Sequence, residues 1–259
     1  MTSEFVHLHN HSDYSLLDGA QKIDQLVNTI DDLNMDAVAL TEHGNMFSVL
    51  PYYKQAKKAG IKPIIGCEIY VAVGSRFEKK TRPDGGWGNN HLILLAQNFT
   101  GYKNLMKLVT AGYLEGFYYR PRIDMDLLRE YSEGLICMSA CLKGVVPEKM
   151  LKGDYEGARK EALLFSEIFQ DRYYLEIQNH GIPEEEQNLK NMKKLSQDLN
   201  LPLVCTNDAH YAKKEHWEAH DIHICLGTGK ERSDPNRLRY ATTEFYFKTQ
   251  DEMHKLFKE

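Results

Sequence analysis

Short apolar runs alternate with amphipathic stretches along most of the chain. Between the runs, apolar residues recur at helical spacing, as in Ile23, Leu26, Val27, Ile30 and Leu33. The apolar runs are each short enough for one buried strand, and they lie at 5–6, 37–40, 63–71, 91–96, 135–139, 173–177 and 201–205. We predict helices at about 23–33, 49–59, 101–112 and 155–169, and another from Pro183 through Leu195. After residue 215 we expect a helix, a short strand at 245–247 and a terminal helix.

The order of these elements predicts the fold class. Seven successive strand–helix units favour a parallel sheet that closes into a barrel, because connections of this length place consecutive strands side by side and parallel. No linker rich in Gly, Ser or Pro divides the chain. We therefore predict a single α/β domain over residues 1–259, with a barrel core at about 4–212 and a C-terminal extension at 213–259.

Chemically active side chains recur where the predicted strands end. Barrel enzymes carry their active sites at the carboxyl ends of the strands. His91 departs from this rule, because it stands at the start of its run, and Glu68 lies inside an apolar run, where an unpaired acid is costly. The side chains that follow strands are His7, His9 and His11 at alternate positions, then His43, Cys141, Asp208 and His210.

Imidazole, carboxylate and one thiolate together indicate a transition metal. This donor set suits Zn²⁺, Mn²⁺ or Fe²⁺ better than Ca²⁺ or Mg²⁺, although a small buried thiol is more commonly a core residue. The donors are too many for one ion, so the sequence predicts a cluster of two or three metals. Such clusters hydrolyse phosphoesters, and the chain contains no phosphate-binding P-loop, dinucleotide fingerprint or nucleophile elbow.

Composition and charge indicate the compartment of the protein and the partners that it can bind. The net charge of −5 provides no general attraction for nucleic acid, so such binding needs a local patch or a metal. The five cysteines form no C-x-x-C pair, which favours a reduced compartment. We find no secretory signal and no apolar run of membrane-spanning length, so we expect a cytoplasmic protein without a membrane partner. The polar stretch 74–90 is predicted to be a surface loop whose basic residues are candidates for contact with substrate phosphates.

Several motifs resemble those of one known family. The PHP (polymerase and histidinol phosphatase) family of metal-dependent phosphoesterases has motifs similar to His9-Asn10-His11-Ser12, Thr41-Glu42-His43-Gly44, Gly66-Cys67-Glu68 and Asn207-Asp208-Ala209-His210. Further stretches resemble the PHP domain of the alpha subunits of bacterial DNA polymerase III, namely 15–19, 98–105, 115–118 and 245–249. Glu42 stands where the family more often has Asp.

The resemblance implies a fold and a site. The fold is a distorted seven-stranded (β/α)7 barrel, and the site is a trinuclear metal centre with nine ligands. His9, His11, Glu68 and Asp208 would hold one metal and carry catalysis. Glu68 would bridge to a second metal held by His91 and Cys141, and a third would be held by Asp18, His43 and His210. The family pattern leaves His7 outside the ligands, and we expect His7 and His180 to support the site or the fold around it.

The resemblance also implies an activity and partners. We expect metal-dependent phosphodiester hydrolysis of a single-stranded DNA 3′ end, a 3′–5′ proofreading exonuclease, with Arg120, Arg122 or Lys143 positioning the strand. The rest of the polymerase alpha subunit, which would carry DNA synthesis, is the implied partner of the 213–259 extension. Two alternatives remain open. One is a phosphatase of a small molecule such as histidinol phosphate or pyrophosphate. The other is a non-catalytic scaffold for a separate proofreading exonuclease.

Overall fold

The computed structural model describes residues 5–81 and 88–258. Residue 4, at the predicted start of the core, and residues 82–87 of the predicted basic loop lie outside this part. The strands are β1 (Ala37–Leu40), β2 (Lys62–Ala72), β3 (Asn89–Ala96), β4 (Arg122–Ile123), β5 (Leu135–Met138), β6 (Tyr173–Ile177) and β7 (Leu203–Cys205). The helices are α1 (Ile23–Asp32), α2 (Val49–Lys58), α3 (Phe99–Leu114), α4 (Met125–Glu130), α5 (Val145–Leu151), α6 (Tyr155–Phe169), α7 (Pro183–Leu199), α8 (Trp217–Thr228) and α9 (Gln250–Leu256), with 3-10 turns at Gln170–Arg172 and Lys214–His216.

The seven strands form one mixed sheet. Their order is β1-β2-β3-β5-β6-β7, and β4 pairs with β2 beside this path. The pairs β1–β2, β5–β6 and β6–β7 are parallel, whereas β3 runs antiparallel to both β2 and β5. The prediction of an all-parallel sheet is therefore wrong for β3. The described part of the β2–β3 connection contains no helix, and a parallel neighbour needs a crossover that usually includes one.

The N-terminal segment joins the two ends of the sheet. His7 pairs with Val38 beside β1, and Asn10 pairs with Ala209 beyond β7, both in parallel orientation. The predicted first strand at 5–6 is therefore wrong as a regular strand, because this segment makes only isolated bridges. The seventh strand is the short β4 instead. The sheet curls into a distorted α/β barrel, as predicted, and the N-terminal segment fills the gap between its ends.

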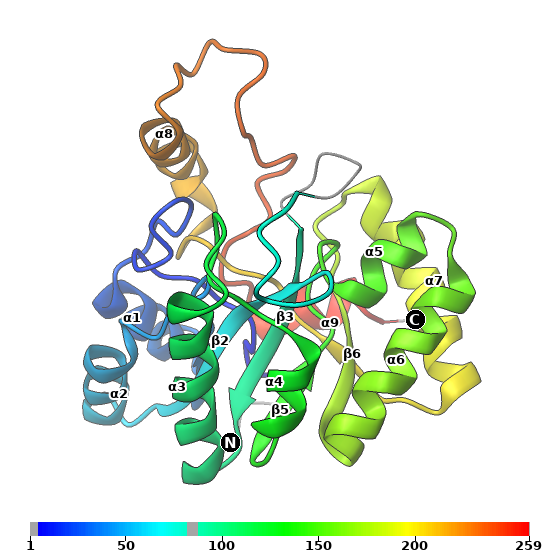
Figure 1. Ribbon diagram of the computed structural model, residues 1–259. Helices are drawn as coiled ribbons and strands as arrows, with labels where there is room; N and C mark the ends of the chain where they lie inside the picture. The colour runs from blue at the N-terminus through cyan, green and yellow to red at the C-terminus, as the bar shows by residue number, and fades with distance from the viewer. Residues whose placement is uncertain (1–4, 82–87, 259) are drawn as a thin grey trace.

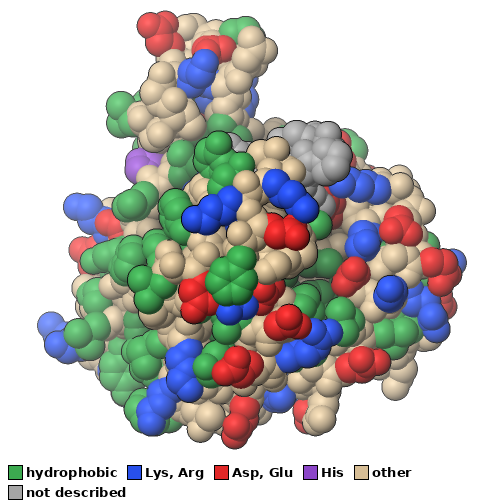
Figure 2. Space-filling view, viewed as in Figure 1, with side chains coloured by type: hydrophobic (Ala, Val, Ile, Leu, Met, Phe, Trp, Pro, Cys, Tyr) green, Lys and Arg blue, Asp and Glu red, His purple; other side chains and the backbone are tan. Residues whose placement is uncertain are grey.

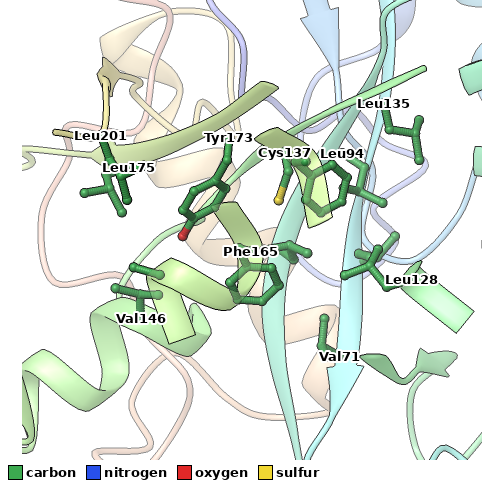
Figure 3. Packing of buried hydrophobic residues seen from close by; sticks show 14 of the residues in the cluster. Val71, Leu94, Leu128, Leu135, Cys137, Val146, Phe165, Tyr173, Leu175 and Leu201 are labelled. Carbon is green, nitrogen blue, oxygen red and sulfur yellow. The ribbon is translucent and has the colours of Figure 1, made fainter. Parts of the chain in front are cut away.

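The helices cover the outside of the curled sheet. Figure 1 shows α1 to α4 along one side of the sheet and α5 to α7 along the other. The largest apolar cluster lies between helices and strands, where Phe165 of α6 stacks on Tyr173 of β6 with ring centroids 5.6 Å apart. Figure 3 shows these two rings beside Cys137 and Leu94. Burial of such rings favours folding by about 25 cal/mol per Å² of apolar area, which anchors the strands that lead to the site.

The chain after residue 212 divides into a projection and a returning segment. Helix α8 and the residues after it stand out above the barrel in Figure 1, and residues 240–249 then return to it. Tyr246 bridges to Tyr211, and His210 N–H donates to the Phe245 carbonyl at 2.8 Å. The predicted strand at 245–247 is thus reduced to one bridge, and the end of the predicted extension packs against the core. Among the described helices, none is long and apolar enough to cross a membrane.

Candidate metal centre

The predicted site residues gather at one end of the barrel. His43 follows β1, Cys141 follows β5, and Asp208 and His210 follow β7, so each stands beyond the carboxyl end of its strand. His91 stands near the beginning of β3 and pairs with Tyr70 near the end of β2. Because β3 is antiparallel, its amino end lies at the same edge as the carboxyl ends of the parallel strands. This reversal explains the one residue that departed from the rule for parallel barrels.

His9 and His11 reach the site from the closing segment. His11 N–H donates to the Ala209 carbonyl at 2.9 Å, and Thr41 N–H donates to the Asn10 carbonyl at 3.0 Å. The Asn10 amide donates at 3.0 Å to the carbonyls of His7 and Ala39. The segment is therefore held from both sides. Its extended geometry directs alternate side chains to one face, and His9 and His11 are both fully buried there.

Glu68 lies at the middle of the cluster. Its Oε1 is 2.7 Å from His43 Nδ1 and 2.8 Å from His91 Nδ1. Its Oε2 is 3.0 Å from His9 Nε2. Cys141 Sγ lies 3.8 Å from the same His91 Nδ1. One carboxylate thus contacts imidazoles from three separate segments, which is the arrangement expected of a bridging ligand.

Three further contacts join Asp208, His11 and Asp18 to the cluster. Asp208 Oδ1 is 3.2 Å from His9 Nε2 and 3.1 Å from His11 Nε2. His43 Nε2 is 3.1 Å from Asp18 Oδ1. Three groups have donor atoms that all lie within 4.8 Å of one another and could hold a metal ion: His9, His11 and Asp208; Glu68, His91 and Cys141; and His11, His43 and His210. Asp18 adjoins the last group through His43.

The charges in the cluster are strongly coupled. Burial opposes ionisation of Asp208, but the imidazoles of His9 and His210 hold its pKa well below the usual range. Burial likewise opposes charge on His9, yet the carboxylates of Asp208 and Glu176 hold its pKa well above the ordinary value. His11 behaves differently, since burial and the neighbouring imidazoles of His43 and His210 lower its pKa to about 3. Anionic carboxylates and a neutral imidazole are the protonation states in which these groups bind metals.

Several buried polar atoms in the cluster have no hydrogen bond among the described residues. They are His11 Nε2, Asp18 Oδ1 and Asp208 Oδ1. His11 Nε2 and Asp208 Oδ1 face each other at 3.1 Å without hydrogen-bond geometry. Leaving a buried donor or acceptor unsatisfied costs about 1–3 kcal/mol. A divalent cation among these atoms would satisfy them, and their N, O and S chemistry fits a transition metal.

Backbone strain occurs beside two of the candidate ligands. Asp208 has φ of 45°, and Ala140, immediately before Cys141, has φ of 64°. Non-glycine residues rarely adopt this left-handed conformation, and such strain concentrates at functional sites. At Asp208 the conformation is held by its neighbours, since the Asn207 amide donates to the Tyr246 carbonyl at 2.7 Å. The returning C-terminal segment thus fixes a candidate ligand.

Glu176 supports the cluster and was missed by the sequence analysis. Its Oε1 accepts a hydrogen bond from His9 Nδ1–H at 2.7 Å, which turns His9 Nε2 toward Glu68 and Asp208. Gln178 Nε2–H also donates to the same oxygen at 3.1 Å. Glu176 is an acid inside an apolar run, as Glu68 is, so the signal that identified Glu68 was also present here.

Glu42 supports the loop that follows the first motif. The carboxylate is buried and accepts hydrogen bonds from the hydroxyls of Ser12, Ser15 and Ser48, with 2.6 Å to Ser15 and 2.9 Å to Ser48. Ser15 Oγ lies 3.1 Å from His11 Nδ1. Glu42 therefore acts on His11 through Ser15, which accounts for an acid at this position in the motif.

His7 and His180 lie beside the cluster and are not part of it. His7 Nε2–H donates to the Lys248 carbonyl at 2.9 Å, and burial lowers the pKa of His7 to about 4. His180 Nε2–H donates to the Asn207 carbonyl at 2.8 Å, and its ring stacks on Phe245. Both histidines fix backbone next to the cluster, since Asn207 precedes Asp208 and Lys248 belongs to the returning segment.

Tyr240 also contacts the cluster, and the sequence contained no signal for it. His210 Nδ1–H donates to the Asp208 carbonyl at 2.7 Å, which leaves Nε2 as an acceptor for the Tyr240 hydroxyl at 2.8 Å. His220 Nε2–H donates to the Asp18 carbonyl at 2.8 Å. The region after residue 212 therefore contributes two side chains to the cluster. The predicted boundary of the core at 212 cuts through the site.

The three predicted substrate-positioning residues have different surroundings. The Arg120 guanidinium lies 5.6 Å above the ring of Tyr70, whose ring centroid is 5.3 Å from that of His91. Lys143 is exposed, and its carbonyl accepts from His91 N–H at 3.0 Å. Both are therefore close to the cluster. Arg122 is 1% exposed and donates to backbone carbonyls, including Gly116 at 3.0 Å, so its prediction as a strand contact is not supported.

The predicted basic loop at 74–90 ends before Asn89, where β3 begins, and Arg76 in its described part has a structural role. Arg76 pairs with Asp124 at 2.9 Å and with Glu115 at 2.6 Å. These two ion pairs neutralise the guanidinium, and the pair with Asp124 holds the loop against the start of α4. Its prediction as a phosphate contact is not supported.

Comparison with known proteins agrees with the motifs. The chain is 52% identical over 257 residues to DNA polymerase III subunit alpha of Borreliella burgdorferi, an alignment that covers 99% of this chain and 22% of that protein. It is 49% identical to the same subunit of Treponema pallidum, with 98% and 22% covered. The chain thus spans about a fifth of the length of these curated relatives.

The comparison with solved structures finds a more distant similarity. A two-domain protein from Bacteroides vulgatus, described as containing a PHP-like metal-dependent phosphoesterase, is 17% identical with a TM-score of 0.46, covering 79% of this chain and 51% of that one. The model of the family named PHP domain matches residues 7–180, more than half of the chain. The chain therefore belongs to the PHP domain family.

Proposed function

We propose that this chain is a metal-dependent phosphoesterase that shortens single-stranded DNA from its 3′ end, the activity of a proofreading exonuclease. The observation that carries the proposal is the fusion of three donor groups into one cluster, with Glu68 and Asp208 each contacting more than one imidazole. A phosphodiester shares one negative charge between two non-bridging oxygens, and its hydrolysis places further charge on the attacking and leaving oxygens. A set of adjacent metal sites suits it better than one isolated site does.

The donor chemistry suggests how the cluster would be loaded. His9, His11, Glu68 and Asp208 would hold one ion, while Glu68, His91 and Cys141 would hold a second. Asp18, His43 and His210 would hold the third. Two to three ions of Zn, Mn or Fe fit these mixed nitrogen, oxygen and sulfur donors. Bound ions of this kind activate water near neutral pH and stabilise charge on a phosphoryl group.

The remaining tasks belong to the chain itself. Arg120 and Lys143 flank the cluster on the side of His91, and each provides a cation for a phosphate of the bound strand. Glu176 holds His9 in one orientation, and Ser15 does the same for His11. The Tyr240 hydroxyl lies at the opposite side, 2.8 Å from His210 Nε2 and 3.4 Å from Asp18 Oδ2, and with an ion on His210 Nε2 it would donate to Asp18 instead. The site thus provides positioning on one side and a hydroxyl on the other.

The relatives suggest the larger context. They are named DNA polymerase III subunit alpha, and about four fifths of their length lies outside the match. We therefore propose that the chain acts as one PHP domain over 1–259 within such a subunit, with DNA and the rest of that subunit as partners. A separate proofreading exonuclease is a further candidate partner. DNA synthesis is not assigned to this chain.

Hydrolysis of an end-labelled single-stranded oligonucleotide tests the proposal. With Mn²⁺ or Zn²⁺ added, we expect stepwise shortening from the 3′ end, and a chelator should stop it. The variants H9A and D208A should lose shortening, whereas H254A, which removes an exposed histidine of α9, should retain it. Hydrolysis of histidinol phosphate or pyrophosphate without any shortening of DNA would refute the proposal in favour of a small-molecule phosphatase. A metal-loaded chain that hydrolyses neither would indicate a scaffold.

A further inference from the structure

A cavity lies beside the metal centre, between α8 and residues 239–243. It encloses about 330 Å³, which is in the lower range of ligand pockets. Its lining includes Trp217, His220, Arg232, Arg239, Tyr240 and Thr242. Figure 2 shows the projection formed by α8 and the residues after it standing above the rest of the surface, with basic and acidic side chains close together on it.

The cavity and the metal centre share two residues. Tyr240 lines the cavity, and its hydroxyl bonds to His210 Nε2 at 2.8 Å. His220 lines the cavity too, and its Nε2–H donates to the carbonyl of Asp18 at 2.8 Å. A molecule in the cavity would therefore adjoin the side of the cluster formed by Asp18, His43 and His210. Arg120 and Lys143, on the other side of the cluster, are not among the residues that line this cavity.

The cavity carries one positive charge that the described protein does not neutralise. Arg232 is paired with Glu218 and Asp221, each at 3.1 Å. Arg237, which follows Arg232 by five residues, is also paired with Asp221, at 2.6 Å. Arg239 is exposed and has no hydrogen bond or ion pair within the described ranges. In the same part of the chain, Thr242 Oγ1 is buried without a hydrogen-bond partner. The lining thus offers a guanidinium and a hydroxyl to a ligand.

Aromatic faces complete the lining. Trp217 is 39% exposed although its indole is large and apolar, and the Arg232 guanidinium lies 5.9 Å from its ring. Tyr240 is wedged against His220 and Phe245, with ring centroids 4.8 Å and 4.5 Å away. Bases of any sequence stack on aromatic side chains, and a guanidinium binds the phosphate between them. The lining therefore matches a base with its attached phosphate better than it matches a purely apolar ligand.

We propose that this cavity binds the nucleotide next to the phosphodiester at the metal centre. The base would lie against Trp217, and Arg239 would bind the 5′-phosphate. This inference rests on the proposed function, because it names the subsite that holds the strand for that reaction. It assigns to α8 and residues 239–243 a substrate contact that lies outside the family match at 7–180.

Tryptophan fluorescence provides a test that needs no metal and no turnover. The chain has two tryptophans, Trp87 and Trp217, so W87F leaves the cavity residue as the only reporter. In the presence of a chelator, deoxyadenosine 5′-monophosphate should quench W87F in a saturable way. Deoxyadenosine should quench only at higher concentration, and inorganic phosphate should not quench. In the W87F background, R239A should weaken the binding of the monophosphate about 10-fold, because a charged hydrogen bond is removed.

A matched variant and the reaction itself complete the test. R129A removes an exposed arginine of α4 and should leave the quenching unchanged. With metal present, R239A should raise the KM for a labelled oligonucleotide by about the same 10-fold, and R129A should not. Absence of saturable quenching, or equal affinity of R239A and W87F, would overturn the subsite. Arginine-dependent quenching in a chain that hydrolyses no DNA would refute the proposed function and leave the nucleotide site in place.

Discussion

At the scale of single residues, the candidate ligands could be predicted, but only some of the residues that support them could. Acids and histidines in or beside apolar runs indicated most of the candidate ligands. Asp18 came only from the resemblance to the PHP family, and all nine lie in one cluster. Glu176 carried the same signal as Glu68 and was overlooked. Tyr240 carried none, because its contact with His210 depends on how residues 240–249 return to the barrel.

Replacement of Glu176 tests whether this residue orients the candidate ligand His9. In E176Q the side chain keeps its shape, but His9 loses a charged partner at 2.7 Å. We expect metal affinity to fall about 10- to 100-fold, as measured by competition with a chelator. In the metal-free protein, NMR of the His9 imidazole should show a lower pKa, because the Glu176 carboxylate helps to raise it.

The control for this prediction is E185Q, which alters a similar pair that reaches the cluster only through the Asn207 backbone. Glu185 Oε1 lies 2.7 Å from His180 Nδ1. E185Q should leave metal affinity and the pKa of His9 unchanged. If E176Q and E185Q had equal effects, Glu176 would be a general structural residue rather than a support for His9.

At the scale of elements, periodicity located most helices and strands but missed the short β4, α4 and α5. Residues 37–40, 155–169 and 173–177 were predicted with the bounds that the structure has. Strand direction was the main failure. The β2–β3 connection is about as long as one that contains a helix, and sequence pattern does not reveal on which side of the sheet a polar connection returns.

Packing of α6 on the sheet should set much of the stability without affecting the site. Phe165 is fully buried against Tyr173, so F165A should lower the free energy of unfolding by about 3–5 kcal/mol. Leu163, on the same helix, is 37% exposed, and L163A should cost much less. Denaturant unfolding would measure both. At low temperature, where F165A remains folded, its metal content should equal that of the unaltered chain.

The projection depends on a charged pair with a defined pH response. Two hydrogen bonds from Arg237, at 2.6 and 2.8 Å, hold the pKa of Asp221 below its usual value. A lowered folded-state pKa contributes stability above the unfolded pKa of about 3.9, and this is lost as pH falls through the folded value. D221N should therefore reduce stability by a constant amount between pH 5 and 8. The difference should shrink below about pH 4 in denaturant unfolding.

At the scale of the whole molecule, the candidate metal centre lies where the two edges of the curled sheet meet. Its predicted ligands span residues 9 to 210, and the segment that carries His9 and His11 joins β1 to the region beyond β7. The barrel class could be predicted from the order of elements. Its closure by isolated bridges could not, since these depend on tertiary contacts of Asn10 rather than on a local pattern.

This arrangement predicts that metal stabilises the entire fold. Ions that bind only the folded chain raise its stability by RT ln(1 + [L]/Kd), about 2.7 kcal/mol at 100 times Kd. Chelator treatment should therefore lower the melting temperature of the unaltered chain. It should have little effect on D208A, in which one carboxylate shared by His9 and His11 is absent. An equal shift in both proteins would mean that the chelator acts elsewhere.

The metal content of each chain tests the central claim most directly. The chain should be purified without chelator, beside H9A, D208A and the exposed-site control H254A, and each analysed for transition metals. We predict two to three ions of Zn, Mn or Fe per unaltered chain and per H254A, and fewer in H9A and D208A. A fully folded, unaltered chain that binds no transition metal even after incubation with these ions would contradict the account.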